Sequence, residues 1–315
     1  MAIPGKSFWI DKNVLVTGGT GFLGRHLLEK LKKKTPKKIT LTNSKKDDLR
    51  LIESCRRVVR HQNLVIHLAA IVGGISFNKE HPATMFYDNA LMGINLMEEA
   101  RKAGVKKVVN ILTVCSYPKF TPTPFKEKDL WDGYPEETNA PYGLAKKMIL
   151  VQGQAYKEQY GFNSIYLIPA NLYGPGDKFD PKLSHVIPAL IRKVSDAKKK
   201  GLDKIVVWGT GRATREFLYV EDAAEGILLA AEKYNKIEPV NLGSGKEISI
   251  AQLSRLICKL MGFKGEIVFD STKPAGQPRR RLDVSRAKKE FGFIAKTQLE
   301  RGLKKTIKWY QSHPV

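Results

Sequence analysis

The sequence predicts an α/β protein with a doubly wound parallel sheet and a smaller C-terminal α/β lobe. Two observations carry this prediction: apolar β-branched runs alternate with stretches of helical periodicity, and a glycine-rich turn joins the first such pair. Strands and helices that alternate in this way build a parallel sheet, and ligands then lie beyond the carboxyl ends of its strands. After Gly176 the chain becomes rich in loops and short strands. We therefore expect a Rossmann-type domain over residues 1–175, with returns near 216–243, and a second lobe over residues 176–315.

Composition limits the class of protein. A chain of 315 residues is long enough for one large or two medium domains. Its three cysteines, Cys55, Cys115 and Cys258, show no C-x-x-C spacing, which argues against a disulfide framework and a zinc site. Residues 1–6 lack an apolar run, and no apolar stretch of about 18 residues follows. We expect a soluble cytoplasmic protein without a metal and without a membrane partner.

The chain carries a formal net charge of +23, from 54 basic and 31 acidic residues. Such an excess accompanies either nucleic-acid binding or the steering of small anionic ligands. Many lysines, however, lie in runs such as 32–34 and 198–200, near expected helix C-termini, where the helix dipole favours cations whatever the function. The sequence favours a solvated lysine-rich surface with an anionic small ligand, and no nucleic-acid partner.

The first strand–turn–helix unit predicts a dinucleotide site. Residues 13–17 form an apolar β-branched run, and apolar residues recur at helical spacing over 22–31. Between them, glycines allow a tight turn and a close approach of the backbone to a pyrophosphate, which then meets the unpaired N–H groups of the helix. The residues expected to bind the cofactor here are Gly18, Gly19, Thr20, Gly21, Phe22, Leu23 and Gly24.

The end of the second expected strand, residues 38–42, bears on the choice between NAD and NADP. An NAD-binding protein would usually place Asp or Glu there to hold the ribose 2′-hydroxyl. The residues that follow are neutral and then basic, which suits a 2′-phosphate and favours NADP(H), with NAD(H) as the alternative. The expected contacts are Ser44 and Lys45 with the phosphate, and Asp48 and Leu49 with the adenine.

Further units continue the pattern. We expect strands at 64–68, 107–112 and 164–169, and a long helix over 82–103. Ala69 follows the first of these strands and is small enough for a ligand to approach the backbone.

Tyr142 and Lys146 form the pair on which the functional prediction depends. Pro141 favours a helix start, because its missing N–H would be unpaired in the first turn anyway. The two side chains then lie four residues apart on one helical face. A nearby ammonium favours the phenolate, so we expect the pKa of Tyr142 to fall below its ordinary value of about 10. Any amphipathic helix can contain this spacing by chance, so the pair needs a cofactor and a partner hydroxyl.

Thr113 supplies such a hydroxyl just beyond an expected strand. If the chain stays extended, Thr113 and Cys115 face the same side, toward the strand-end crevice. A hydroxyl there can bond a substrate carbonyl together with Tyr142. The alternatives are a strand-end threonine and a small buried cysteine, both of which are common.

The glycine turn, Thr113 and the Tyr142/Lys146 pair together resemble the extended short-chain dehydrogenases/reductases. More closely, four segments resemble the GDP-L-fucose synthase family, and the resemblance spans almost the whole chain. These segments are Val-Gly-Gly (72–74), Cys-Ser-Tyr-Pro-Lys (115–119), Ser-His-Val-Ile-Pro-Ala-Leu (184–190) and Arg-Glu-Phe-Leu-Tyr-Val-Glu-Asp (215–222).

The resemblance implies an NADPH-dependent enzyme that epimerises carbons 3 and 5 of GDP-4-keto-6-deoxy-D-mannose and then reduces its 4-ketone to give GDP-L-fucose. It implies that Tyr142 protonates the carbonyl oxygen, that Lys146 lowers the pKa of Tyr142 and holds the nicotinamide ribose, and that Thr113 replaces a family serine. Cys115 and His185 match the acid/base pair of the epimerisations. Inversion needs a base on one face and an acid on the other, and both groups exchange protons near neutral pH.

The resemblance also implies ligand contacts and an assembly. Pro169, Asn171 and Leu172 match a turn that lines the cofactor, and His185 is expected to contact the cofactor as well. Thr20 stands where some members of the family carry an arginine, and this difference counts against NADP. A homodimer is implied, through the helix after the third strand and the Tyr142 helix. Contacts to the GDP-sugar fall on cations and an indole, which suit a diphosphate with appended rings: Lys193, Trp208, Arg215 and, from the cluster 279–281, Arg279.

Two other functions stay open at this point. One is a related enzyme acting on another GDP-4-keto sugar of the colitose or heptose type, since its motif residues would be nearly the same. The other is a non-catalytic protein that senses NADP or binds nucleic acid, which only the +23 charge supports.

Overall fold

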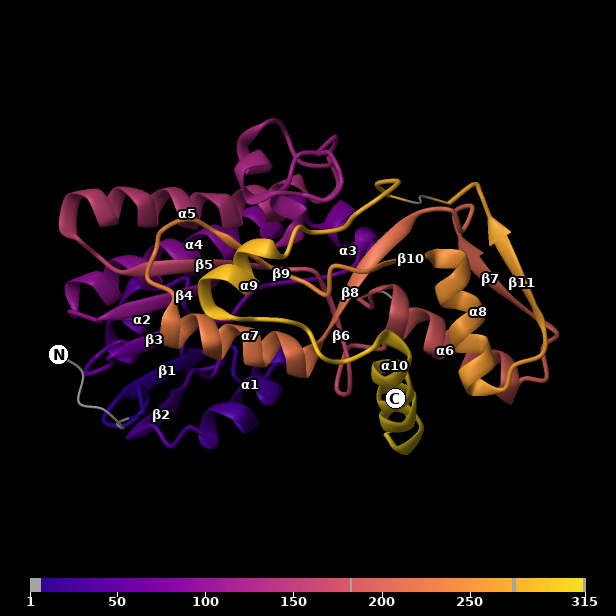
Figure 1. The fold of residues 1–315 in the computed structure, drawn as a ribbon, viewed down its shortest axis with the longest axis horizontal. Helices are drawn as coiled ribbons and strands as arrows, with labels where there is room; N and C mark the ends of the chain where they lie inside the picture. The colour runs from indigo at the N-terminus through magenta and orange to yellow at the C-terminus, as the bar shows by residue number, and fades with distance from the viewer. Residues whose placement is uncertain (1–6, 182, 274–275, 314–315) are drawn as a thin grey trace.

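The computed structural model describes residues 7–181, 183–273 and 276–313, so the N-terminal residues 1–6 lie outside it. Within the described residues, the centre of the molecule is a six-stranded parallel sheet in the order β2-β1-β3-β4-β5-β9 (Figure 1). The order reverses between β1 and β3, where a doubly wound sheet opens a crevice for ligands. The strands are β1 (Asn13–Thr17), β2 (Lys38–Leu41), β3 (Leu64–His67), β4 (Lys107–Ile111), β5 (Ser164–Pro169) and β9 (Val240–Leu242).

The central strands are buried on both faces, which explains their continuous apolar runs. Their register places Leu15 of β1 beside Val65 of β3, and Val65 beside Val108 of β4. The strands expected from the sequence are confirmed, with ends that differ by one residue at most.

Helices cover both faces of this sheet (Figure 1). The long helices α4 (Pro82–Lys102) and α5 (Ala140–Tyr160) pack side by side on one face, and each has a proline in its first turn. The described residues include no helix that is long and apolar enough to span a membrane. The other helices around the sheet are α1 (Phe22–Lys32), α2 (Ile52–Val58), α3 (Ile75–Glu80), α7 (Val220–Lys233) and α9 (Ser285–Phe291).

A second group of elements lies beyond the carboxyl ends of the central strands (Figure 1). Two small sheets occur in it, one in the order β10-β8-β6 and one that pairs β11 with β7. Its strands are β6 (Asn171–Tyr173), β7 (Lys204–Trp208), β8 (Thr214–Tyr219), β10 (Glu247–Ser249) and β11 (Glu266–Asp270), and its helices are α6 (Val186–Lys199), α8 (Ile250–Met261) and α10 (Leu299–Ser312).

Two hydrophobic cores underlie these two groups. The first surrounds the central sheet and includes β9, which pairs with β5. It also includes Leu282, Phe291 and Phe293, from a segment that the sequence assigned to the second lobe. That assignment is corrected here: the chain returns to the first core twice, and the second return has no motif of its own.

Candidate active site

A cavity of about 1180 Å³ lies between the two cores, at the carboxyl ends of β1, β3 and β4. This volume exceeds that of an ordinary single-ligand pocket and suits a dinucleotide together with a second ligand. Gly19, Lys45 and Arg279 do not line it. The other residues expected from the sequence do: Gly18, Thr20, Gly21, Phe22, Leu23, Gly24, Ser44, Asp48, Leu49, Ala69, Thr113, Cys115, Tyr142, Lys146, Pro169, Asn171, Leu172, His185, Lys193, Trp208 and Arg215.

The glycine turn has the shape of a pyrophosphate cradle. Gly18 has a φ of +67°, and a Cβ on it would lie 2.8 Å from the backbone nitrogen of Ala69. A Cβ on Gly24 would lie 2.3 Å from the carbonyl oxygen of Gly18, so the helix packs directly on the turn. The N-cap residue Gly21 offers no side chain to the first N–H groups of α1, which are therefore open to an anion. These residues fit a dinucleotide.

The end of β2 differs from the expectation. Ser44 lines the cavity, but Lys45 is exposed outside it. Arg50 is a cation that does line this end, and its guanidinium bonds both carboxylate oxygens of Asp48 and lies 3.2 Å from Asp88. The proposed phosphate contact of Lys45 therefore finds no support in the geometry, while that of Ser44 does.

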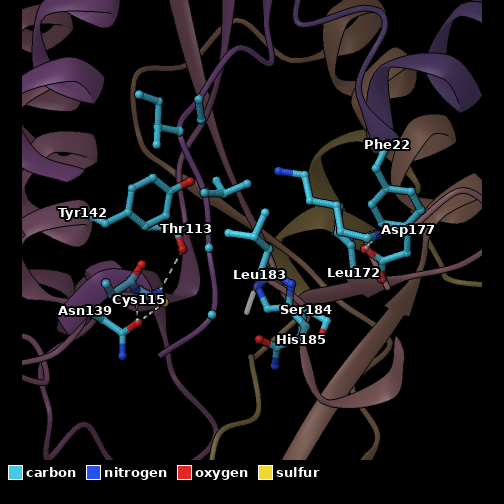
Figure 2. Close-up of a pocket in the computed structure, with 18 of the residues that line it drawn as sticks. Phe22, Thr113, Cys115, Asn139, Tyr142, Leu172, Asp177, Leu183, Ser184 and His185 are labelled. Carbon is cyan, nitrogen blue, oxygen red and sulfur yellow. Dashed lines mark hydrogen bonds between the residues drawn. The ribbon is translucent and has the colours of Figure 1, made fainter. Parts of the chain in front are cut away.

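Tyr142 and Lys146 both line the cavity from α5, and Figure 2 shows the ring of Tyr142 there. The ammonium of Lys146 lies 5.9 Å from the centre of the Tyr142 ring. Burial lowers the pKa of Lys146 to about 8. Burial raises the pKa of Tyr142, and the nearby Cys115 raises it further. The expected fall of the Tyr142 pKa is therefore wrong, because desolvation of the buried phenol is the largest influence on it.

Thr113 and Cys115 follow β4 in a different conformation from the one expected. The chain does not stay extended but enters a short 3₁₀ turn over Val114–Ser116, in which the Thr113 hydroxyl accepts a bond from the Cys115 N–H at 3.2 Å. Both residues nevertheless line the cavity, next to Tyr142 (Figure 2). Thr113 is 8% exposed, so its hydroxyl is sheltered.

Cys115 has two polar neighbours. Its Sγ lies 3.7 Å from the amide oxygen of Asn139 and 3.8 Å from Nη1 of Arg280. The thiol is thus placed between an amide and a cation.

His185 stands at the N-cap of α6, on the other side of the pocket from Tyr142 and Cys115 (Figure 2). Its ring is accessible from the cavity, but the surrounding protein encloses it, and this burial lowers its pKa. The ammonium of Lys178 lowers that pKa further. A neutral imidazole and a thiol therefore face one cavity from opposite walls, which is an arrangement that can exchange protons on two faces of a ligand.

Lys193, Trp208 and Arg215 line the part of the cavity built by α6, β7 and β8. The Lys193 ammonium lies 5.8 Å from the centre of the Trp208 ring, and 47% of Trp208 is exposed. Burial, together with the neighbouring Arg280, lowers the pKa of Arg215 to about 10. The neighbouring positive charges of Arg215 and Arg280 together favour an anionic ligand between them.

The structure corrects the expectation that Arg279 contacts the substrate. Arg279 is exposed, and its guanidinium pairs with the carboxylate of Glu247. Arg280 lines the cavity instead, and its guanidinium bonds the side-chain oxygen of Gln277 at 2.6 Å and 2.9 Å. In an extended segment neighbouring side chains point to opposite sides, so a register error of one residue exchanges inside for outside.

Sequence reasoning missed other residues of the cavity. Asp177 is 9% exposed, and its Oδ1 accepts a bond from the Lys178 N–H at 2.7 Å, while its Oδ2 has no hydrogen-bond partner. It lies beside Phe22 and Leu172 (Figure 2), and burial raises its pKa to about 7. The only signal for it was its place after the Gly-Pro-Gly turn.

The chain is similar to known proteins over nearly its whole length. A model of the NAD dependent epimerase/dehydratase family matches residues 14–243. The chain is 40% identical to a GDP-L-fucose synthase of Sinorhizobium fredii, over 99% of this chain and 97% of that protein. It is 36% identical to a GDP-L-colitose synthase of Yersinia pseudotuberculosis, over 94% and 97%. Among solved structures, a GDP-L-fucose synthetase from Naegleria fowleri bound to NADP matches with a TM-score of 0.86 and 31% identity, over 96% of this chain and 94% of the other.

Proposed function

The chain belongs to the NAD dependent epimerase/dehydratase family, and from this premise we propose that it converts GDP-4-keto-6-deoxy-D-mannose to GDP-L-fucose. The reaction inverts carbons 3 and 5 and then reduces the 4-ketone with NADPH. The observation that carries the proposal is the meeting of a Tyr142/Lys146 pair and a Cys115/His185 pair in one cavity. The first pair suits a carbonyl reduction, and the second suits proton exchange at carbon.

The residues of α5 and β4 account for the reduction. Tyr142 donates its phenolic proton to the ketone oxygen, and its raised pKa keeps that proton in place at neutral pH. The Thr113 hydroxyl holds the same oxygen as a second donor. Lys146, with a pKa of about 8, holds the nicotinamide ribose and supports the charge that develops on the phenol. When bound, NADPH supplies the hydride to the carbonyl carbon.

The epimerisations use Cys115 and His185. Carbons 3 and 5 both flank the ketone, so a proton removed from either leaves an electron pair that the ketone oxygen accepts. One group removes that proton from one face, and the other returns a proton to the opposite face. The two groups enter the cavity from opposite walls (Figure 2), as inversion requires.

The remaining cavity residues accommodate the two ligands. The glycine turn and the N-terminus of α1 hold the cofactor pyrophosphate, Ser44 lies at its adenosine end, and Ala69, Pro169, Asn171 and Leu172 line its nicotinamide half. We propose that Trp208 stacks on the guanine, and that the cations contact the diphosphate. These cations are Lys193, Arg215 and Arg280, the last in place of Arg279.

A direct assay tests the proposal. The purified protein, incubated with GDP-4-keto-6-deoxy-D-mannose and NADPH, should consume NADPH and release GDP-L-fucose, identified by mass and by comparison with an authentic standard. Folded protein that consumes no NADPH contradicts it.

A second candidate is the corresponding reaction on a colitose-type substrate, which the identity to the Yersinia enzyme supports. A product profile over several GDP-4-keto sugars decides between the two. Turnover of the colitose-type substrate at a higher kcat/KM than the fucose precursor favours the second candidate.

We further propose a homodimer in the cytoplasm. In each subunit, residues 1–175 and the returns near 216–243 and 282–293 form the NADP-binding domain, and the other elements of 176–315 form the sugar-binding lobe. The support for a dimer is an apolar surface on two adjacent helices, formed by Phe86 and Tyr87 of α4 and Met148 and Val151 of α5, each at least 39% exposed. Val151→Arg should convert a dimer to a monomer in light scattering, whereas Leu202→Arg, at an exposed position elsewhere, should not. A wild-type monomer contradicts the proposal.

A further inference from the structure

Asn139 occupies the N-cap of α5, yet its side chain makes no cap hydrogen bond. Asparagine at this position normally accepts a bond from the N–H groups of the first helical turn. Here the side chain turns instead toward Cys115 and the cavity (Figure 2). The helix therefore forgoes a stabilising contact, and the amide is engaged elsewhere.

Glu136 determines which way this amide faces. The amide nitrogen of Asn139 donates to Oε2 of Glu136, which also accepts a bond from the Thr138 hydroxyl at 2.6 Å. An ionised carboxylate offers acceptors only, so the nitrogen of Asn139 must lie on its side. The amide oxygen therefore faces the opposite way, where Nδ2 of Asn78 donates to it at 3.1 Å.

The oxygen oriented in this way meets the thiol of Cys115, 3.7 Å away. Because an amide oxygen only accepts hydrogen bonds, the S–H group must be the donor in this contact. On its other side the sulfur accepts from Nη1 of Arg280 at 3.8 Å. The two neighbours act in opposite directions: the amide oxygen favours the thiol, and the guanidinium favours the thiolate. Arg215 and Tyr142 also interact electrostatically with Cys115.

We propose that Asn139, fixed by Glu136, is a positioning residue that directs the S–H bond of Cys115 and retains its proton against the pull of Arg280. The proposal deepens the proposed function, on which the catalytic role of Cys115 rests. Glu136, Asn139 and Cys115 then form a chain of hydrogen bonds that sets the protonation state of the thiol before a sugar carbon exchanges a proton with it.

Alkylation of Cys115 by iodoacetamide across a range of pH tests this inference, with mass spectrometry of the Cys115 peptide as the readout. Glu136→Gln allows the Asn139 amide to turn over, since glutamine offers a donor as well as an acceptor. Asn139→Leu removes the acceptor altogether. Each variant should move the alkylation profile to lower pH and raise the rate near neutral pH about fivefold, which is the effect of one hydrogen bond.

Glu137→Gln is the matched control. It removes the same charge one residue away, from an exposed side chain that pairs with Lys119. Its alkylation profile should coincide with that of the wild type. Profiles of Glu136→Gln and Asn139→Leu that also coincide with the wild type overturn the proposal, and so does an equal shift in Glu137→Gln.

Two further measurements keep the test decisive. If Asn139→Leu does not fold, Glu136→Gln alone decides, with its thermal midpoint compared with that of the control. Deuterium exchange from solvent into carbons 3 and 5 of the sugar separates the two proposals. A wild type that exchanges neither carbon contradicts the proposed function, and the alkylation profiles still decide the role of Asn139.

Discussion

The two walls of the cavity present different kinds of chemical group. The wall at the ends of β1, β3 and β4 presents backbone groups and small residues, such as Gly18 and Ala69, with the reactive side chains close to the strand ends. The facing wall presents long side chains from separate segments, among them Lys193, Trp208 and Arg280. A turn and a helix end are local structures, whereas a set of converging long side chains depends on the whole tertiary structure. The first wall can therefore be recognised from a sequence motif, whereas the residues of the second wall are identified only in the folded structure.

Tyr142→Phe should give the largest effect, and it sharpens the comparison by testing the first wall alone. Loss of the proton donor should slow the reduction about a thousandfold. Deuterium exchange at carbons 3 and 5 should persist, because it depends on Cys115 and His185. NADPH consumption and NMR of the sugar measure the two steps separately. Tyr134→Phe, at an exposed position, is the control, and loss of both steps in Tyr142→Phe would contradict the division of labour.

Asp177→Asn tests the cost of burying a charge in the part of the cavity beside Phe22. Burial raises the pKa of Asp177 from its ordinary 3.8 to about 7, so the folded protein binds the extra proton between these values. The wild type should therefore lose stability as the pH rises from about 4 to about 7, by up to about 4 kcal/mol. The asparagine variant should escape this loss and be the more stable protein above pH 7, with no difference below pH 4.

Urea unfolding at several pH values measures that difference. Asp203→Asn, at an exposed position, should follow the wild type throughout. Equal stability of Asp177→Asn and the wild type at all pH values would show that neighbouring groups offset the cost of burying this carboxylate.

Arg280→Ala and Arg279→Ala compare two neighbours on opposite sides of one segment. Arg280 is 9% exposed in the cavity, and loss of its charged hydrogen bonds to the diphosphate should raise KM about 10- to 100-fold. Arg279 makes an exposed ion pair with Glu247, so its removal should change KM less than about threefold. Steady-state kinetics measures both, and a larger effect at Arg279 would restore the assignment made from the sequence.

These neighbours also show where sequence reasoning ends. The cofactor turn, the strands and the Tyr142/Lys146 pair could be predicted because periodicity and glycine spacing are local properties. The choice between Arg279 and Arg280 depends on the register of an extended segment that meets the cavity from far along the chain, and no local pattern determines it. The sequence also did not predict the second return of the chain to the first core, near Phe291 and Phe293, for the same reason.

A second wrong prediction from the sequence concerns the pKa of Tyr142. The sequence places an ammonium near the phenol of Tyr142 and so predicts a lower pKa, but only the structure reveals that desolvation is the larger effect. A shifted pKa is likewise not a sign of function by itself. Burial lowers the pKa of Lys107 to about 8, as it does for Lys146, yet the Lys107 ammonium donates to carbonyl oxygens at the end of α7 and lies outside the cavity. The position of the group, rather than its pKa, separates the two lysines.

Trp208→Ala should give the smallest effect on catalysis, and it tests whether the second wall only binds. The chain offers a matched control in Trp131, which is 50% exposed and lies 4.3 Å from the Lys147 ammonium, outside the cavity. Trp208 is 47% exposed and also lies near a lysine, so the two substitutions differ chiefly in whether the indole can stack on a bound guanine. Loss of stacking should raise KM about tenfold in Trp208→Ala and leave kcat unchanged. Trp131→Ala should change neither value, and a fall in kcat with Trp208→Ala would mean that this wall also positions the reacting sugar.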